Sequence, residues 1–201
     1  MPPKQSKRDT VQQPLPRLGP EPYLELMDQT ALAGTDRKLA RMGLFLLWTS
    51  DNVLDAIDLD LSAYGLTESK LDLLLLLTLH QSQAQISPSM IADRLGIRRA
   101  SVTSLLDWTE QRGWIIREQN STDRRKIHVR ITEAGSHLVQ QVLPVFWSSC
   151  ASLASILEPE EQVVFSRIIE KIHHYMEGRL GWADNFFKHI IRLSNIFNCL
   201  Y

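Results

Sequence analysis

Apolar residues recur at helical spacing over the first third of the chain. This spacing predicts a short helix over 23–33 that Gly34 ends, and a longer helix that Thr35 caps and Tyr64-Gly65 breaks. One face of the longer helix carries an apolar stripe, made of Leu39, Met42, Leu46, Leu47, Val53, Leu54 and Ile57. The following segment LDLLLLLTL, capped by Thr67, is apolar nearly all round, which is typical of a helix in the middle of a core.

Between 87 and 132 the pattern changes to short elements. Ser87 is a favourable N-cap, Pro88 suits the first helical position, and Gly96 ends that helix. Three residues then lead to a second helix, whose apolar positions are Val102, Leu105 and Leu106. Two short helices joined by a tight turn that contains a glycine form a helix-turn-helix.

Two β-branched runs follow the second helix, which Gly113 ends. Residues 114–117 and 127–131 read as strands, and the polar loop EQNSTDRRK joins them. A helix-turn-helix followed by a hairpin with a charged tip is a winged helix-turn-helix. Such a module places one helix in the DNA major groove and reaches the flanking backbone or minor groove with its wing.

The last third of the chain is again helical. Thr132 caps a long helix that Pro144 should kink, Pro159 restarts the pattern, and Gly178 and Gly181 end it. The flanking helices carry more apolar surface than one winged helix can cover, which favours a two-fold homodimer. The tail after Gly181 is also periodic and is expected to pack on the dimer; a membrane-surface helix is the weaker alternative.

The predicted fold is therefore mainly α with a small β-hairpin wing: a winged helix-turn-helix with long N- and C-terminal dimerisation helices. Four segments follow from this pattern. We expect a disordered tail over 1–20, N-terminal dimerisation helices over 21–65, a DNA-binding domain over 66–132, and C-terminal dimerisation helices with an extended tail over 133–201. A basic arm that touches DNA phosphates is the alternative interpretation of the first segment.

Composition narrows the class of protein. The net charge is −1, but residues 88–130 hold nine Lys and Arg against five Asp and Glu, so a basic module sits on an acidic body, as in DNA-binding proteins. No apolar run approaches the roughly 20 residues that span a bilayer, and the N-terminus has no signal-peptide core. Two cysteines are too few for a disulfide framework. These features predict a cytoplasmic protein.

The motifs within this module resemble the MarR-type transcription regulators. The resemblance rests on Ile91-Ala92-Asp93-Arg94-Leu95-Gly96, Ser101-Val102-Thr103, Leu105-Leu106-Asp107, Arg112-Gly113, and above all on Asp123-Arg124-Arg125 followed by Val129-Arg130-Ile131-Thr132-Glu133-Ala134-Gly135. It covers roughly 66–176. The sequence departs from the family pattern at three places. Arg98 stands where a Ser or Thr cap is usual, Ser104 replaces a common Arg, and Trp108-Thr109 replaces a basic residue followed by Leu. These departures concern the DNA sequence preference more than the fold.

Ten residues are candidates for DNA contact. Hydroxyls and guanidiniums in the first turns of the recognition helix reach phosphates and base edges, and the N–H groups that open the preceding helix can bind a phosphate. An Arg at the wing tip can enter the narrow minor groove, and the resemblance implies that Arg125 enters while Asp123 orients it. Some of these side chains could instead be solvated surface. The candidates are Ser87, Ser89, Arg98, Arg99, Ser101, Thr103, Ser104, Asp123, Arg124 and Arg125.

No catalytic or cofactor motif stands out, so no enzyme and no cofactor are expected. Glu170, His174 and Glu177 share a helix face and could hold a metal, but a solvated charge face is the commoner meaning of such a grouping. Cys150 lies in an apolar stripe, which favours inert packing over a redox sensor. Trp48 and Trp147 could line a ligand pocket, although core packing explains both.

We therefore expect a homodimeric transcription regulator, most simply a repressor, on double-stranded DNA with a pseudo-palindromic operator. The resemblance implies a small effector, often a phenolic or aromatic acid, between the dimer helices and the DNA-binding lobe. The alternative is a winged-helix protein-interaction module without a specific operator. The wing arginines and the basic balance of 88–130 argue against that alternative.

Overall fold

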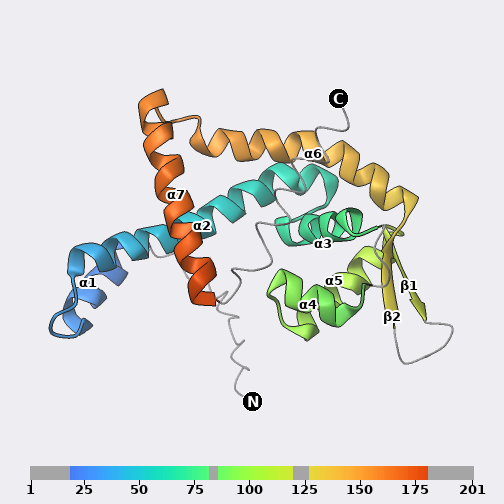
Figure 1. Cartoon of the computed structure of the whole chain (residues 1–201), viewed down its shortest axis with the longest axis horizontal. Helices are drawn as coiled ribbons and strands as arrows, with labels where there is room; N and C mark the ends of the chain where they lie inside the picture. Colours follow the sequence, from blue (N-terminus) through green and yellow to red (C-terminus); the bar gives the residue numbers. More distant parts are fainter. Residues whose placement is uncertain (1–18, 82–85, 120–126, 181–201) are drawn as a thin grey trace, which may run out of the picture. The chain divides into compact units, whose positions relative to one another are not determined.

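The computed structural model describes residues 19–81, 86–119 and 127–180. In chain order its elements are α1 (Glu21–Thr30), α2 (Arg37–Leu61), the 3₁₀ turn η1 (Ser62–Tyr64), α3 (Glu68–Leu79), α4 (Pro88–Leu95), α5 (Arg99–Gln111), β1 (Ile115–Gln119), β2 (Ile127–Ile131), α6 (Glu133–Ala154) and α7 (Pro159–Leu180) (Figure 1). The predicted class, mainly helical with a two-stranded wing and helices at both ends, is confirmed. The chain divides into two compact units, with the division between Leu59 and Asp60 inside α2.

The first unit contains α1 and most of α2. The Tyr23 ring lies edge-on to the Trp48 ring at 4.8 Å, and this contact joins the two helices. Two expected boundaries are wrong. α1 ends at Thr30 rather than at residue 33, and the residue that caps α2 is Asp36 rather than Thr35, because the Asp36 carboxylate accepts the Leu39 N–H at 3.0 Å. A carboxylate at this position also favours the helix dipole.

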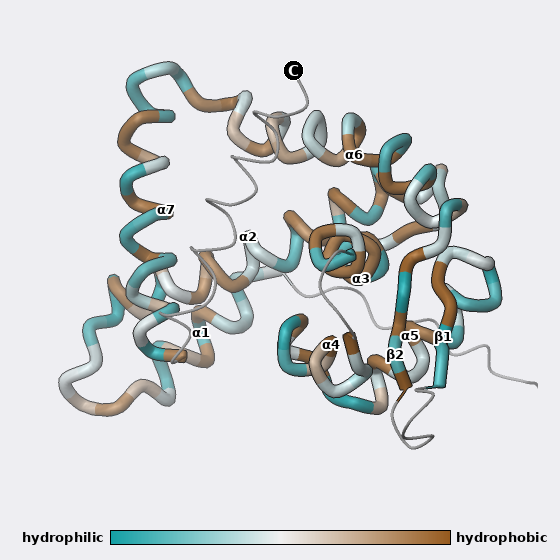
Figure 2. The backbone as a smooth tube through the Cα atoms, turned by 45° about the vertical axis from the view of Figure 1, so that its right-hand side comes forward, coloured by the Kyte–Doolittle hydropathy of each residue, from teal (hydrophilic) through white to brown (hydrophobic). Residues whose placement is uncertain are grey.

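The core of the second unit is built around α3. Leu71, Leu73, Leu74 and Leu77 are almost completely buried, and α3 packs on α4, α6 and β2. Figure 2 shows the hydrophobic residues of α3 among these elements. Each buried leucine contributes about 2 kcal/mol relative to an exposed one. The prediction that this apolar helix is central is therefore confirmed.

The wing is an antiparallel hairpin in which Ile115 pairs with Ile131 and Gln119 with Ile127. Ile86 adds a bridge to Val129, whose N–H donates to the Ile86 carbonyl at 2.8 Å. The first strand begins at Ile115 and not at Trp114. The reason is that the Trp114 N–H donates to the Thr109 carbonyl and so closes the end of α5.

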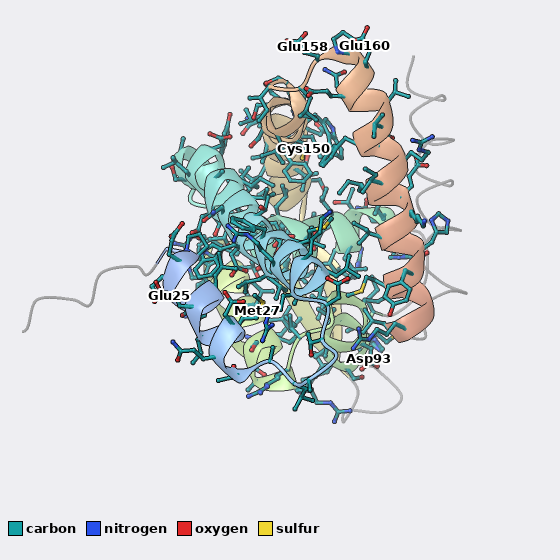
Figure 3. All side chains as sticks on the ribbon, turned by 90° about the vertical axis from the view of Figure 1, so that its left-hand side faces the viewer. Glu25, Met27, Asp93, Cys150, Glu158 and Glu160 are labelled. Carbon is teal, nitrogen blue, oxygen red and sulfur yellow. The ribbon has the colours of Figure 1, made fainter. Side chains whose placement is uncertain are left out.

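The helices α6 and α7 begin with local caps. Thr132 caps α6 as predicted, because its hydroxyl accepts the Gly135 N–H at 3.0 Å. Pro144 lies inside α6, which is continuous through it. The Glu158 N–H donates to the Glu161 carboxylate at 3.0 Å where α7 begins, and Glu158 and Glu160 both lie at this connection (Figure 3). Gly178 does not end α7, which runs to Leu180.

Apolar residues on one face of α7 stay exposed: Val164, Phe165, Ile168, Ile169, Met176 and Leu180. Among the described helices, none is by itself long and apolar enough to cross a membrane. α6 and α7 meet the length and composition requirement only as a pair, and that pair is bent by 105°.

Candidate nucleic-acid interface

The N-terminus of α4 is capped by a serine, as the sequence predicts. The Ser87 hydroxyl accepts the Met90 N–H at 3.3 Å and lies 2.9 Å from the Ser89 hydroxyl. Pro88 occupies the first helical position, where its missing N–H costs nothing. The two hydroxyls and the first N–H groups of α4 therefore gather at one helix end, which is a favourable place for a phosphate.

The turn after α4 is set by Gly96, whose φ of 64° is in the left-handed region that favours glycine. The Ile97 N–H then donates to the Ala92 carbonyl at 3.2 Å, which closes the end of α4. α5 begins at Arg99, directly after the cap residue Arg98, whose side chain makes no capping bond. This geometry leaves the Arg98 guanidinium available for a contact outside the helix.

α5 has a buried face and an exposed face. Val102, Leu106 and Thr109 are buried, and the Thr109 hydroxyl donates to the Leu105 and Leu106 carbonyls at 2.9 and 3.1 Å. The exposed face of the first two turns brings together five of the predicted residues: Arg98, Arg99, Ser101, Thr103 and Ser104. The structure therefore presents two guanidiniums and three hydroxyls on one surface.

Two of these hydroxyls also bond to their own helix. The Thr103 hydroxyl donates to the Arg99 carbonyl at 3.2 Å, and the Ser104 hydroxyl donates to the Ala100 carbonyl at 3.4 Å. Their oxygens keep free acceptor positions, and either hydroxyl can rotate toward a phosphate or a base edge. The hydrogen-bonding chemistry expected from the sequence is present at this surface.

Asp123, Arg124 and Arg125, the predicted wing-tip residues, lie outside the described residues. The strands below the tip are described, and they are tied to α5 by an arginine that the sequence analysis did not single out. Arg117 on β1 meets Glu110 through its backbone N–H at 3.0 Å, through Nε at 2.8 Å and through Nη2 at 2.5 Å. Its Nη1 lies 2.8 Å from the Asp107 carboxylate.

We call Asp107, Glu110 and Arg117 the Arg117 clamp. The hydrogen bond from the Arg117 side chain lowers the pKa of the Glu110 carboxyl below its usual 4.5. The same bond, together with that to Asp107, raises the pKa of Arg117. Asp107 and Glu110 lie three residues apart on one helix face, which was the available signal, but only the tertiary fold shows that Arg117 faces them.

A second unforeseen cluster joins α3 to the end of α5. The Trp108 ring lies between two cations, with Lys70 Nζ 3.9 Å and Arg112 Cζ 3.5 Å from its centroid. The Trp114 ring meets the Trp108 ring edge-on at 5.3 Å. This cation–π stack fixes the C-terminal end of α5 against the core helix α3.

The base of the wing is closed by Thr132. Its hydroxyl donates to the Gly113 carbonyl at 2.7 Å, and its N–H donates to the Trp114 carbonyl at 3.0 Å. Gly135 packs against the same carbonyl, because a Cβ there would lie only 2.2 Å from the Trp114 oxygen. This close approach explains why glycine ends the Thr-Glu-Ala-Gly motif.

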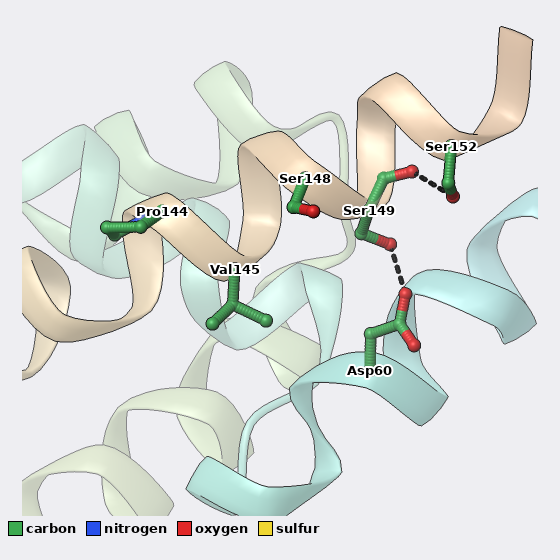
Figure 4. Close-up of a pocket in the computed structure, with 6 residues that line it drawn as sticks. All are labelled: Asp60, Pro144, Val145, Ser148, Ser149 and Ser152. Atoms are coloured by element: carbon green, nitrogen blue, oxygen red, sulfur yellow. Dashed lines mark hydrogen bonds between the residues drawn. The ribbon is translucent and has the colours of Figure 1, made fainter. Parts of the chain in front are cut away.

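A cavity of about 560 Å³ lies in the second unit. It is lined by Asp60 at the end of α2 and by Pro144, Val145, Ser148, Ser149 and Ser152 of α6. Figure 4 shows Ser149 between Asp60 and Ser152, with the hydroxyl of Ser149 donating to Asp60 at 2.5 Å. We call it the α2–α6 cavity. Neither Trp48 nor Trp147 lines this cavity.

Other candidate chemistry is weaker. Among the described residues, no three His, Cys, Asp or Glu side chains lie together so that they could hold a metal ion. Glu170, His174 and Glu177 therefore do not form a site there. Burial raises the pKa of the Cys150 thiol, so little thiolate is present near neutral pH. This agrees with inert packing of Cys150.

A helix-turn-helix, a hairpin fixed to its second helix, and flanking long helices together define a winged helix-turn-helix protein. The MarR family model matches residues 68–127. Residues 68–127 hold both helices and the hairpin up to the start of β2. We therefore assign residues 68–127 to the MarR family.

Relatives and solved structures agree with this assignment. The transcriptional repressor MprA of Escherichia coli K12 is 34% identical over 113 residues, which are 56% of this chain and 63% of MprA. The chain thus matches less than two thirds of that relative's length. The YusO crystal structure from Bacillus subtilis superposes with a TM-score of 0.52 at 25% identity, covering 71% of this chain and 99% of YusO. The Staphylococcus aureus MepR–DNA complex has the same fold, with a TM-score of 0.55 at 24% identity over 71% of this chain and 99% of MepR.

Proposed function

We propose that this protein is a homodimeric transcription regulator that binds a pseudo-palindromic operator and acts as a repressor. One observation carries the proposal: the first two turns of α5 expose Arg98, Arg99, Ser101, Thr103 and Ser104 together, while the opposite face of α5 is buried. These side chains are the donors and acceptors that read base edges and hold phosphates. α5 is the recognition helix in this proposal, and the wing follows the flanking backbone or minor groove.

The relatives support this proposal. MprA is named a transcriptional repressor, and MepR has been solved in complex with DNA. A repressor that acts on chromosomal DNA works in the cytoplasm, and we place the protein there as part of the proposal.

The homodimer rests on the exposed apolar face of α7. Six large side chains of this face are between 39% and 51% exposed, although they are spaced as one stripe. A stripe of this kind is stable when a second copy covers it. Two copies related by a two-fold axis would place two α5 helices about one DNA helical turn apart, in successive major grooves.

We also propose that a small ligand tunes operator affinity. A ligand that prefers one spacing of the two DNA-binding lobes shifts the population of dimers toward that spacing. The α2–α6 cavity supports this part of the proposal, because its volume lies within the range of small-molecule sites.

The test is selection of DNA sites from a random pool by the purified full chain, repeated at two salt concentrations. We expect an inverted repeat with half-sites about one turn apart, and affinity that falls steeply with salt. Arg99→Ala should weaken binding and relax preference at one position of each half-site, by about 1–3 kcal/mol if its guanidinium meets a guanine. Arg41→Ala on α2 is the matched control and should change neither property.

The second candidate is a winged-helix module that binds a protein and has no operator. Binding of the chain to no DNA, or binding without salt dependence, would favour this candidate. The cluster of exposed guanidiniums and hydroxyls on α5 supports the operator-binding regulator instead.

A further inference from the structure

The α2–α6 cavity has a distinctive charge environment. Of the described residues that line it, Asp60 alone is charged. The sequence from 42 to 69 holds no Lys or Arg, and neither does α6. An organic anion would therefore find no Lys or Arg in residues 42–69 or in α6 to pair with.

The backbone adds to this negative character. Asp60 lies in the last turn of α2, and the C-terminal end of an α-helix carries partial negative charge on its unpaired carbonyls. Both features favour a positively charged group at this end of the cavity.

The hydrogen-bonding groups that line the cavity also favour a positively charged ligand, because they accept hydrogen bonds. The Ser149 hydroxyl already donates to Asp60 Oδ2 at 2.5 Å, and the Ser152 hydroxyl donates to the Ser149 carbonyl at 2.7 Å. The hydrogens of both hydroxyls are used, so these serines and the carboxylate offer acceptor positions. A ligand that complements these acceptors must carry hydrogen-bond donors.

Of the remaining lining residues, Ser148 adds one more hydroxyl, and Pro144 and Val145 form an apolar wall on α6. Pro144 has no N–H, so the Gln140 carbonyl in the preceding turn lacks its helical donor and is one more acceptor on this part of α6. The cavity thus combines a carboxylate, several acceptors and a hydrocarbon surface.

From these observations we infer that the α2–α6 cavity binds a protonated organic amine with an apolar body, the ammonium group meeting Asp60 and the hydrocarbon part lying on Pro144 and Val145. This ligand class differs from the aromatic acids that the family resemblance implies. The inference rests on the proposed function, since it names the effector class of the proposed ligand-tuned regulator. A ligand held between the end of α2 and α6 would lower operator affinity by favouring a different lobe spacing.

Three probes with one aromatic body test the ligand class: 2-naphthylmethylamine, 2-naphthylmethanol and 2-naphthoate at pH 7. Their binding to the full chain is measured by calorimetry. We expect the amine to bind about five-fold more tightly than the alcohol, as an exposed ion pair allows, and the acid to bind least. Asp60→Asn keeps the shape and the bond from Ser149, and should remove the advantage of the amine.

Asp51→Asn is the matched control, because it removes the same charge from α2 at a residue that does not line the cavity. It should keep the preference for the amine. Tightest binding of 2-naphthoate, a preference for the amine that survives Asp60→Asn, or no binding of any probe would each overturn the inference.

Operator affinity is measured separately, first without any probe. Failure to bind an operator refutes the proposed function, whereas the calorimetry still decides which ligand class the cavity takes. Operator affinity is then measured with the amine present. If the amine binds through Asp60 and operator affinity falls by at least three-fold, the proposed function and the inferred ligand class are both supported. If operator affinity is unchanged, the regulatory role of the cavity is overturned.

Discussion

The Arg117 clamp gives the sharpest prediction about how α5 and the wing are held together. Among the described residues of the wing, Arg117 bonds two side chains of α5 at once, those of Asp107 and Glu110. Its side chain is 29% exposed, and those of Asp107 and Glu110 are 49% and 34% exposed, so solvent screens both pairs. Each pair is then worth about 0.5–1 kcal/mol, and Arg117→Ala should lower the free energy of unfolding by about 1–2 kcal/mol.

Arg117→Lys is the matched variant. It keeps the charge but cannot present the planar fork that reaches two carboxylates, so about half of this stability should be lost. Urea denaturation followed by tryptophan fluorescence measures both variants. A change below about 0.3 kcal/mol for Arg117→Ala would refute the reasoning, because surface substitutions without a partner give changes of that size.

The pH dependence separates the clamp from simple packing. Because the folded-state pKa of Glu110 is lowered, its pairing stabilises the protein fully at pH values above the usual 4.5 and is lost as the pH falls through the folded-state value. The difference in unfolding free energy between the wild type and Glu110→Gln should therefore be constant near neutral pH and shrink in acid. A difference that does not change with pH would contradict an ionic role.

DNA binding provides the last readout for the clamp. If Arg117 positions the wing and does not touch phosphate, Arg117→Ala weakens operator binding but leaves the slope of log affinity against log salt unchanged. A slope reduced by about one would instead place its guanidinium on a phosphate.

Three further substitutions test other parts of the module. Gly135→Ala should destabilise the fold by about 2–3 kcal/mol in urea denaturation, because the new Cβ would overlap the Trp114 carbonyl; wild-type stability would show that the close approach is absent. Trp108→Leu should cost about 1–2 kcal/mol, since it removes the ring between Lys70 and Arg112, and additivity with Lys70→Ala in a double-mutant cycle would argue against the stack. Arg125→Ala should weaken operator binding by about 1–3 kcal/mol if Arg125 enters the minor groove, and unchanged affinity in a filter-binding titration would remove it from the site.

Local rules predicted the parts of the fold that local sequence controls. Ser87, Pro88 and Gly96 bound α4 as expected, because capping and backbone preference act within a few residues. Thr35 and Asp36 are both good caps, so the sequence alone could not rank them. Gly178 stays inside α7, since a single glycine costs a helix only about 1 kcal/mol and packing offsets that amount.

The candidate site also has parts that local sequence predicts and parts that only the tertiary fold shows. Helical spacing places Ser104 opposite the buried Val102 and Leu106, with Ser101 and Thr103 on the flanks. Arg98 and Arg99 are exposed because they lie where the helix begins. The Arg117 clamp needed the packing of β1 on α5. The α2–α6 cavity needed Asp60 and Ser149, 89 residues apart, to meet. No periodicity within one element encodes such contacts.

Thr132 closes the hairpin base and starts α6 with the same hydroxyl. The chain between Gln119 and Ile127 is thereby bracketed by fixed strands, so residues can be added to or removed from this loop in the course of evolution without shifting the start of α6. Any length change between Gly113 and Ile115 would instead break the bonds that Thr132 makes.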